Sequence, residues 1–128
     1  MPDYLLDTNI LILHLRQSPP ITALLTSWSD TSVLYISAIT RAEILAGMHP
    51  HEEAHTLELL DSLTSISVNE AIADHAGRLI YQYARQGMHI SFPDALIAAT
   101  ALESGLALYT RNVRHFRFIA ELLVIQPY

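Results

Sequence analysis

Three acidic residues, far apart in the chain, each stand beside an apolar segment. Asp7 follows the apolar run Tyr4–Leu6, and apolar residues at helical spacing come after it. Glu43, in TRAEIL, and Asp94, in SFPDALIAA, lie near the starts of two further helical patterns. If these helices begin at the carboxyl edge of one parallel sheet, the three carboxylates converge on one pocket. Like charges held so close repel, and a bound divalent cation relieves that repulsion.

The ligands available around these acids are oxygen atoms. The chain has no cysteine, which excludes a thiolate site. Carboxylates with hydroxyl and amide oxygens suit Mg²⁺ or Mn²⁺ better than Zn²⁺, and such sites commonly serve phosphate chemistry. The residues that could add oxygens are Thr8, Asn9, Thr110 and Asn112, although each is also an ordinary turn or cap residue.

Helix capping is the competing explanation for all three acids. Asp7 is a favoured type of N-cap for the helix that follows it. Thr40-x-x-Glu43 and Ser91-x-x-Asp94 both fit a capping box in the first turn of a helix. The eight residues after Asp94 are almost all apolar, so its helix should be buried on most sides. A carboxylate entering such a helix is costly unless it is paired or binds a metal, so both explanations stay open.

A second metal pattern lies in the segment His51–His55, which reads HEEAH. It matches the H-E-x-x-H helix of zinc metalloproteases, but a five-residue match is often accidental. On a helix, His51 and His55 form one stripe with Glu58 and Ser62, while Leu57, Leu60 and Leu63 lie roughly opposite. The histidines should therefore point away from the core, and a solvated face is the preferred interpretation.

The elements that must position these residues alternate between strands and helices. Strands are expected at Tyr4–Leu6, Val33–Ile36, Ile66–Val68, Leu106–Thr110 and Leu122–Ile125. Helices are expected from Ile10, at Ile21–Trp28, from Ser37 or Thr40 to Ala46, and at Glu52–Leu63, Asn69–Gln86, Ser91–Ser104 and Arg114–Ala120. Because no hairpin signal occurs, the pattern predicts an α/β fold with a parallel sheet covered on both faces.

The composition bounds the class of protein. With 128 residues, of which 51% are hydrophobic, the chain should form one globular domain over residues 1–128. All seven bases are arginine, so lysine-dependent sites such as a P-loop or an aspartate-nucleophile phosphatase are excluded or disfavoured. Thirteen acids argue against a simple basic platform for nucleic acid, but Arg111, Arg114 and Arg117 form a local basic cluster. No signal peptide or membrane-spanning run is evident, so a soluble, cytoplasmic protein is expected.

Four ordered motifs, LLDTNI, RAEILAG, PDALIAA and YTRNVRHF, resemble those of the PIN-domain family, and within it the VapC-like toxins of toxin–antitoxin pairs. The closing VIQP is similar as well. The resemblance implies a three-layer α/β/α sandwich and a metal-dependent ribonuclease. Asp7, Glu43 and Asp94 match the family's core metal-binding acids, and Thr8 and Asn9 match its companion residues.

One departure concerns the fourth acid that PIN domains often carry. The two candidate positions hold Asn112, which offers a carbonyl oxygen without charge, and His115. A second metal ion would therefore bind weakly or only with substrate phosphate. This departure puts a two-metal mechanism in doubt more than the activity itself.

The sequence thus predicts an endoribonuclease that uses Mg²⁺ or Mn²⁺, held by Asp7, Glu43 and Asp94. Arg111 and Arg114 would bind RNA phosphates, with ordinary surface charge as the alternative. The resemblance implies an antitoxin partner and a homodimer, with Ile21–Trp28 and Ala54–Leu63 as candidate surfaces. The rival functions are a non-catalytic binding module that has lost its metals and a zinc protease.

Overall fold

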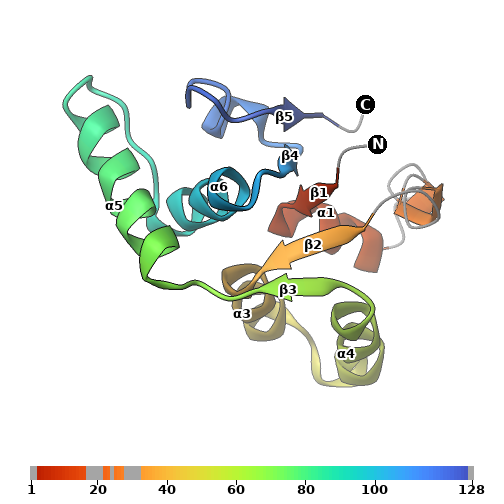
Figure 1. Cartoon of the computed structure of the whole chain (residues 1–128). Helices are drawn as coiled ribbons and strands as arrows, with labels where there is room; N and C mark the ends of the chain where they lie inside the picture. The colour runs from red at the N-terminus through yellow and green to blue at the C-terminus, as the bar shows by residue number, and fades with distance from the viewer. Residues whose placement is uncertain (1–2, 17–21, 24, 28–32, 127–128) are drawn as a thin grey trace.

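In the part of the chain that the structure describes, five parallel strands form one sheet in the order β3-β2-β1-β4-β5 (Figure 1). The structure is a computed structural model that describes residues 3–16, 22–23, 25–27 and 33–126. Every strand pairing in the sheet is parallel. The strands are β1 (Tyr4–Leu6), β2 (Leu34–Ser37), β3 (Thr64–Ile66), β4 (Ala107–Tyr109) and β5 (Val124–Ile125). The predicted α/β class with a parallel sheet is confirmed.

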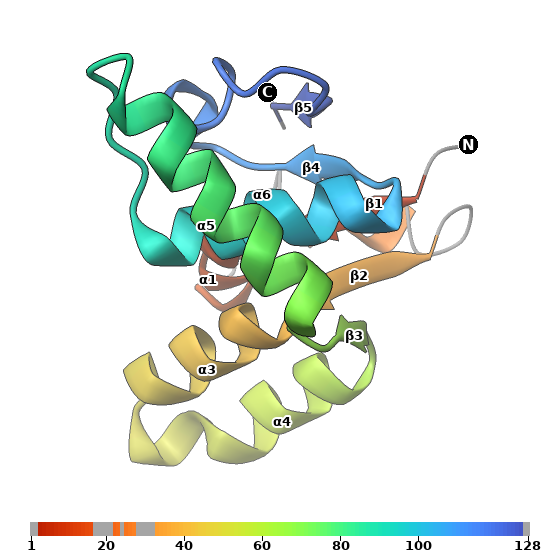
Figure 2. The ribbon, with the colours of Figure 1, turned by 60° about the vertical axis from the view of Figure 1, so that its left-hand side comes forward.

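Side chains alternate between the two faces of the sheet and so build two cores. Leu5 and Leu108 belong to the core that contains residues of α5 (Glu70–Ala84) and α6 (Phe92–Ser104). Leu6 and Tyr109 belong to the core on the other face. Residues of α1 (Thr8–Leu15), α3 (Ala38–Gly47) and α4 (Glu53–Asp61) contribute to that second core. The chain is therefore a three-layer α/β/α sandwich, with α5 and α6 packed together on one side (Figure 2).

The strand order creates a switch point between β1 and β4. From β1 the chain moves outward through β2 to β3, and it then returns to place β4 on the other side of β1. In open parallel sheets, ligands bind beyond the carboxyl ends of the strands at such a point. Asp7 directly follows β1 and Thr110 directly follows β4. These two residues therefore flank the position where the topology favours a site.

Several predicted boundaries are wrong. No α-helix forms at Arg114–Ala120, where a 3-10 turn, η2 (Val113–His115), is followed by turns. The core takes up Phe116 and Ile119 there, and the Tyr83 hydroxyl accepts a bond from the backbone of Ala120. β3 starts two residues earlier than expected because Thr64 pairs in register with Tyr35 of β2.

Two predicted helices are divided or lie only partly within the described residues. The helix predicted at Glu52–Leu63 is divided into a 3-10 turn, η1 (Pro50–Glu52), and α4. The helix predicted at Ile21–Trp28 is helical at 22–23 and 25–27, and its remaining residues lie outside the described ones. Within the described ranges, none of the helices is both long and apolar enough to cross a membrane.

Candidate metal centre

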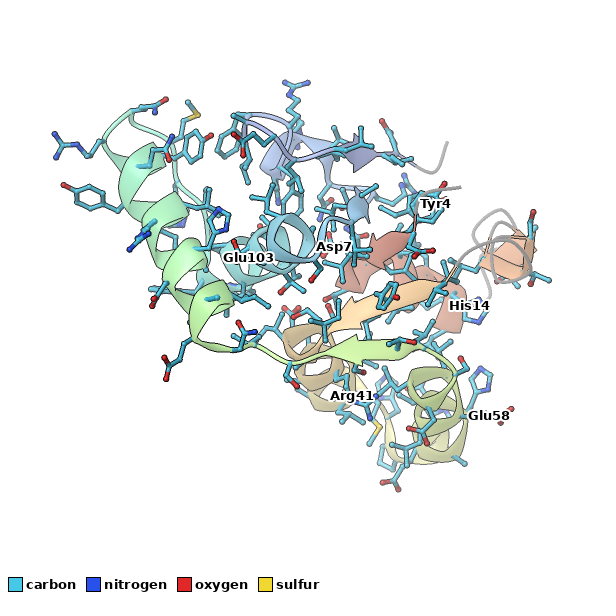
Figure 3. The ribbon with its side chains drawn as sticks, viewed as in Figure 1. Tyr4, Asp7, His14, Arg41, Glu58 and Glu103 are labelled. Atoms are coloured by element: carbon cyan, nitrogen blue, oxygen red, sulfur yellow. The ribbon has the colours of Figure 1, made fainter. Side chains whose placement is uncertain are left out.

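Asp7 lies at the junction of β1 and α1, close to the middle of the molecule (Figure 3). Its backbone is extended, and its Oδ1 accepts a bond of 2.8 Å from the Thr8 backbone N–H, so the predicted N-cap is confirmed. The other oxygen, Oδ2, accepts from the Thr110 hydroxyl at 2.7 Å and from Asn9 Nδ2 at 3.3 Å. The residue is only 5% exposed. Helix capping therefore accounts for Oδ1 of Asp7 but not for Oδ2, which lies at the switch point between β1 and β4.

The environment of Asp7 favours its neutral form. Burial raises the pKa of the Asp7 carboxyl from 3.8 to about 6, although the bonds from Thr110 and Thr8 oppose the rise. The negative charges of Asp94 and Glu43 also raise this pKa. The charges of Glu43 and Asp94 therefore reach the Asp7 carboxyl. A bound cation would reverse this balance because it favours the ionised carboxylate.

Glu43 reaches the same region from α3. The expected capping box with Thr40 is wrong, because Ser37 caps this helix through the Ile39 N–H and no acid stands in the first turn. Glu43 lies in the second turn and is exposed, whereas Thr40 is buried. The Thr8 hydroxyl donates to Glu43 Oε1 at 2.7 Å and lies 3.1 Å from the Thr40 hydroxyl. Glu43 is thus held by the residue next to Asp7 rather than by its own helix.

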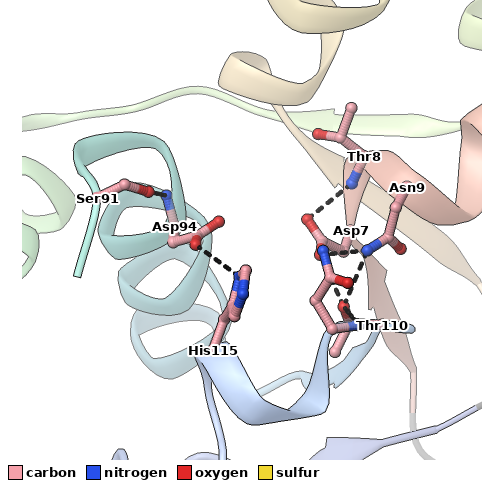
Figure 4. Close-up of polar contacts among 8 residues, drawn as sticks. Asp7, Thr8, Asn9, Ser91, Asp94, Thr110 and His115 are labelled. Atoms are coloured by element: carbon pink, nitrogen blue, oxygen red, sulfur yellow. Dashed lines mark hydrogen bonds and ion pairs between the residues drawn. The ribbon is translucent and has the colours of Figure 1, made fainter. Parts of the chain in front are cut away.

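Asp94 stands in the first turn of α6. Ser91 is the N-cap and accepts from the Asp94 N–H at 3.3 Å, which confirms that half of the predicted capping box. The apolar residues that follow Asp94 are mostly buried, as expected. The carboxylate itself remains 27% exposed and its Oδ2 lies 3.5 Å from His115 Nδ1 (Figure 4). Sequence reasoning noticed His115 only as a replacement for an acid and missed this contact.

The supporting residues tie the ends of β1 and β4 together. Asn9 Nδ2 donates weakly to the Thr110 hydroxyl at 3.4 Å, and Asn9 Oδ1 accepts from the Arg111 N–H at 3.4 Å. The Asn112 N–H donates to the same Thr110 hydroxyl at 2.9 Å, while the residue is exposed. The candidate residues Thr8, Asn9, Thr110 and Asn112 therefore lie around Asp7.

The donor set fits an ion that keeps much of its water. Carboxylate, hydroxyl and amide oxygens are the ligands of hard divalent cations. Among the described residues, no three His, Asp or Glu side chains form a group that would hold a metal ion by themselves. Mg²⁺ commonly retains several waters and binds through one or two carboxylates with substrate phosphate. Such an ion needs fewer protein ligands than a closed site.

Comparison with known proteins agrees with this geometry. A family model described as the PIN domain matches residues 4–122. The chain belongs to the PIN domain family. Ribonuclease VapC10 of Mycobacterium tuberculosis is 36% identical over 118 residues, which are 92% of this chain and 89% of VapC10. The resemblance expected from the four motifs is confirmed.

Solved structures share the fold across the whole chain. A toxin–antitoxin complex from Klebsiella pneumoniae contains a chain with a TM-score of 0.83 and 32% identity, and 98% of both chains is covered. DNA-bound VapBC from Salmonella typhimurium has a chain with a TM-score of 0.87 and 25% identity, and all of both chains is covered. The sandwich is thus the PIN fold that VapC-like chains adopt.

Three of the seven arginines of this PIN domain lie just after the switch point. Arg111, Arg114 and Arg117 are all exposed. Together with His115 and Gln126 they help to line an open hollow of about 300 Å³. Because His115 also contacts Asp94, the basic cluster adjoins the acidic centre.

The zinc-protease pattern of this PIN domain has other roles. Glu52 accepts from the His49 N–H at 2.7 Å in a capping box, and the rings of His49 and His51 stack 5.9 Å apart. His51 and His55 are exposed, and within the described part of the chain no third His, Asp or Glu joins them in a metal-holding group. The expected apolar stripe is wrong in one respect, since Leu57 is 38% exposed.

Proposed function

We propose that this PIN domain is an endoribonuclease that depends on Mg²⁺ or Mn²⁺ and is the toxin of a toxin–antitoxin pair. The observation that carries the proposal is the buried Asp7 carboxylate at the switch point, whose pKa is raised by burial and by the charges of Asp94 and Glu43. A carboxylate whose pKa is strongly perturbed by burial and by specific charged neighbours is a candidate for function. VapC10, a relative over 92% of the chain, is named a ribonuclease.

Asp7, Glu43 and Asp94 would hold the ion, and Asn112 would offer an amide oxygen. When bound, the ion lowers the pKa of a bound water and stabilises negative charge on the phosphate. The Thr110 hydroxyl and the Thr8 N–H fix the two oxygens of Asp7. The Thr8 hydroxyl fixes Glu43. These bonds hold the carboxylates in position before substrate arrives, so little ordering is left for the reaction itself.

Arg111 and Arg114 would bind RNA phosphates beside this centre. The guanidinium group suits phosphate because its planar N–H donors match the phosphate oxygens. Both arginines line the hollow that contains His115, the neighbour of Asp94. A phosphodiester held there would lie within reach of the acidic centre. This local cluster supports RNA binding by a chain whose net charge is −6.

A protein antitoxin is the proposed partner, and a homodimer the proposed assembly. The Klebsiella pneumoniae structure is of a toxin–antitoxin complex, and the similar chain in it aligns with 98% of this chain. Helix α4 remains a candidate surface because Leu57 is exposed there. Co-expression with the neighbouring gene should give a complex that co-purifies. A lone monomer from the two-gene vector would contradict this part of the proposal.

The decisive experiment is a ribonuclease assay on protein freed of any partner. Total RNA is incubated with Mg²⁺ or Mn²⁺, with EDTA, and with the variants Asp7→Asn and Asp74→Asn. The latter makes the same change at an exposed position of α5. We expect metal-dependent cleavage that Asp7→Asn abolishes and Asp74→Asn retains. Full cleavage by folded Asp7→Asn would reject the proposed centre, and calorimetry without specific metal binding would favour a non-catalytic module.

A further inference from the structure

His115 stands beside Asp94 on a firmly held piece of backbone. The His115 N–H donates to the Asn112 carbonyl at 2.9 Å and the Phe116 N–H donates to the Val113 carbonyl at 3.0 Å. The side chain of Phe116 is completely buried, which anchors the turn directly after His115. The imidazole is therefore carried to Asp94 by a fixed turn, with Nδ1 on the side of the carboxylate (Figure 4).

The contact contributes little to the stability of the fold. The side chain of His115 is 53% exposed and that of Asp94 is 27% exposed. Contacts between charged side chains with this degree of exposure stabilise a fold only weakly, because water screens them. A purely stabilising role therefore gives a weak reason for a histidine at this position.

The geometry suits two neighbouring ligands of one metal ion. Two ligands side by side on an octahedral ion, each at about 2.1 Å from it, are about 3 Å apart. His115 Nδ1 and Asp94 Oδ2 are 3.5 Å apart, so small side-chain rotations bring them to that separation. Within the described residues, no third His, Asp or Glu completes a metal-holding group with them. The proposed ligands Asp7 and Glu43, with water and a substrate phosphate oxygen, would fill the remaining positions.

We propose that His115 binds the metal ion through Nδ1 beside Asp94, and that this nitrogen makes the site select a first-row transition ion over Mg²⁺. The inference rests on the proposed metal-dependent function. Mg²⁺ takes oxygen ligands almost exclusively, whereas imidazole is a good ligand for transition ions. An all-oxygen centre would lack this discrimination. The side chain of His115 thus sets which metal the nuclease uses.

The test measures the nitrogen directly. Electron spin-echo spectroscopy of bound Mn²⁺ reports a coordinated ¹⁴N nucleus, and calorimetry gives the affinities for Mg²⁺, Mn²⁺ and Co²⁺. The variants are His115→Gln, His115→Asp and the matched control His75→Gln. His75, on α5, makes a comparable contact, since its Nδ1 lies 2.7 Å from Glu103 Oε2. Glu103 lies at the other end of α6 (Figure 3). The control therefore removes a histidine that contacts another carboxylate of α6, away from the proposed centre.

We expect the wild type and His75→Gln to show ¹⁴N modulation, and both His115 variants to lose it. The preference for Co²⁺ over Mg²⁺ should fall roughly tenfold or more in His115→Asp, which replaces nitrogen by oxygen. Mn²⁺ bound without modulation, or modulation that survives in His115→Gln, would overturn this inference and leave the proposed function intact. If no divalent ion binds the wild type, the result would contradict both this inference and the proposed function.

Discussion

Burial of the ionised Asp7 carboxylate lowers the free energy of unfolding. Its carboxyl pKa is about 6 rather than 3.8, and each pKa unit is worth about 1.4 kcal/mol. Between pH 4 and pH 6 the folded state keeps a proton that the unfolded state has lost. The free energy of unfolding therefore falls as the pH rises through this window. Above pH 6 the whole cost, about 3 kcal/mol, is present in protein without metal.

Replacing Asp7 by asparagine should remove that cost. In EDTA at pH 7.5, Asp7→Asn should be more stable than the wild type by about 1–3 kcal/mol, since the amide keeps an oxygen for the Thr8 N–H and loses the buried charge. At about pH 3 the difference should shrink toward zero, because Asp7 is then largely protonated in both states. Urea unfolding at several pH values measures it, and a difference that does not change with pH would contradict the raised pKa.

Adding the metal should reverse the order of stabilities. An ion present at 100 times its Kd stabilises the state that binds it by about 2.7 kcal/mol. At pH 7.5 this gain should appear in the wild type and be largely absent from Asp7→Asn, whose amide carries no charge. Thermal unfolding with and without Mn²⁺ tests the expectation. Equal stabilisation of both proteins would place the ion elsewhere.

The sequence predicts which residues form the candidate site, but it does not predict the contacts that the structure shows among them. The order of small motifs and the alternation of elements are sufficient to select Asp7 and Asp94 and to expect them at one sheet edge. The 3.5 Å contact between His115 and Asp94 joins residues 21 positions apart through a turn that follows β4. Its direction depends on the burial of Phe116, a tertiary effect that local patterns do not contain.

At the scale of the elements, α6 is the helix that carries Asp94 into the site. Ser91 caps its N-terminus, and Gly105 ends it in the left-handed conformation with φ 66°. Both residues are local signals, which explains why sequence reasoning located this helix so closely. The segment Arg114–Ala120 shows the opposite case. Two of its apolar residues are buried in the core, but no side chain caps a helix there and no apolar stripe at helical spacing forms.

Glycine-to-alanine substitutions should have opposite effects on stability at the end of a helix and in its interior. Gly105→Ala should destabilise the fold by about 1–2 kcal/mol, because an L side chain is strained at positive φ. Gly77→Ala, inside α5 with no atom within 4 Å of the added Cβ, should stabilise it by about 0.5–1 kcal/mol. Urea unfolding of the two variants measures both signs. Destabilisation by both would mean that helix propensity does not govern these positions.

At the scale of the whole molecule, charge is distributed unevenly. The chain has seven arginines and thirteen acidic residues, yet three of the arginines fall within seven residues beside the acidic centre. Acidic surface repels a polyanion such as RNA, and a basic cluster attracts it. The molecule should therefore bind RNA through few phosphate contacts, and its affinity should depend on salt only modestly. This distribution favours approach of the strand from the side of η2.

Removal of one arginine should be visible in the salt dependence of RNA binding. Arg114→Gln should lower the slope of log Kd against log salt by about 0.7, the value for one phosphate contact with a single strand. Arg78→Gln removes the same charge from the exposed face of α5 and should leave the slope unchanged. Both changes are made in the Asp7→Asn background without metal, so that the RNA is bound and not cut. Equal effects of the two substitutions would show that net charge, rather than contact at the cluster, governs binding, and would remove Arg114 from the proposed RNA site.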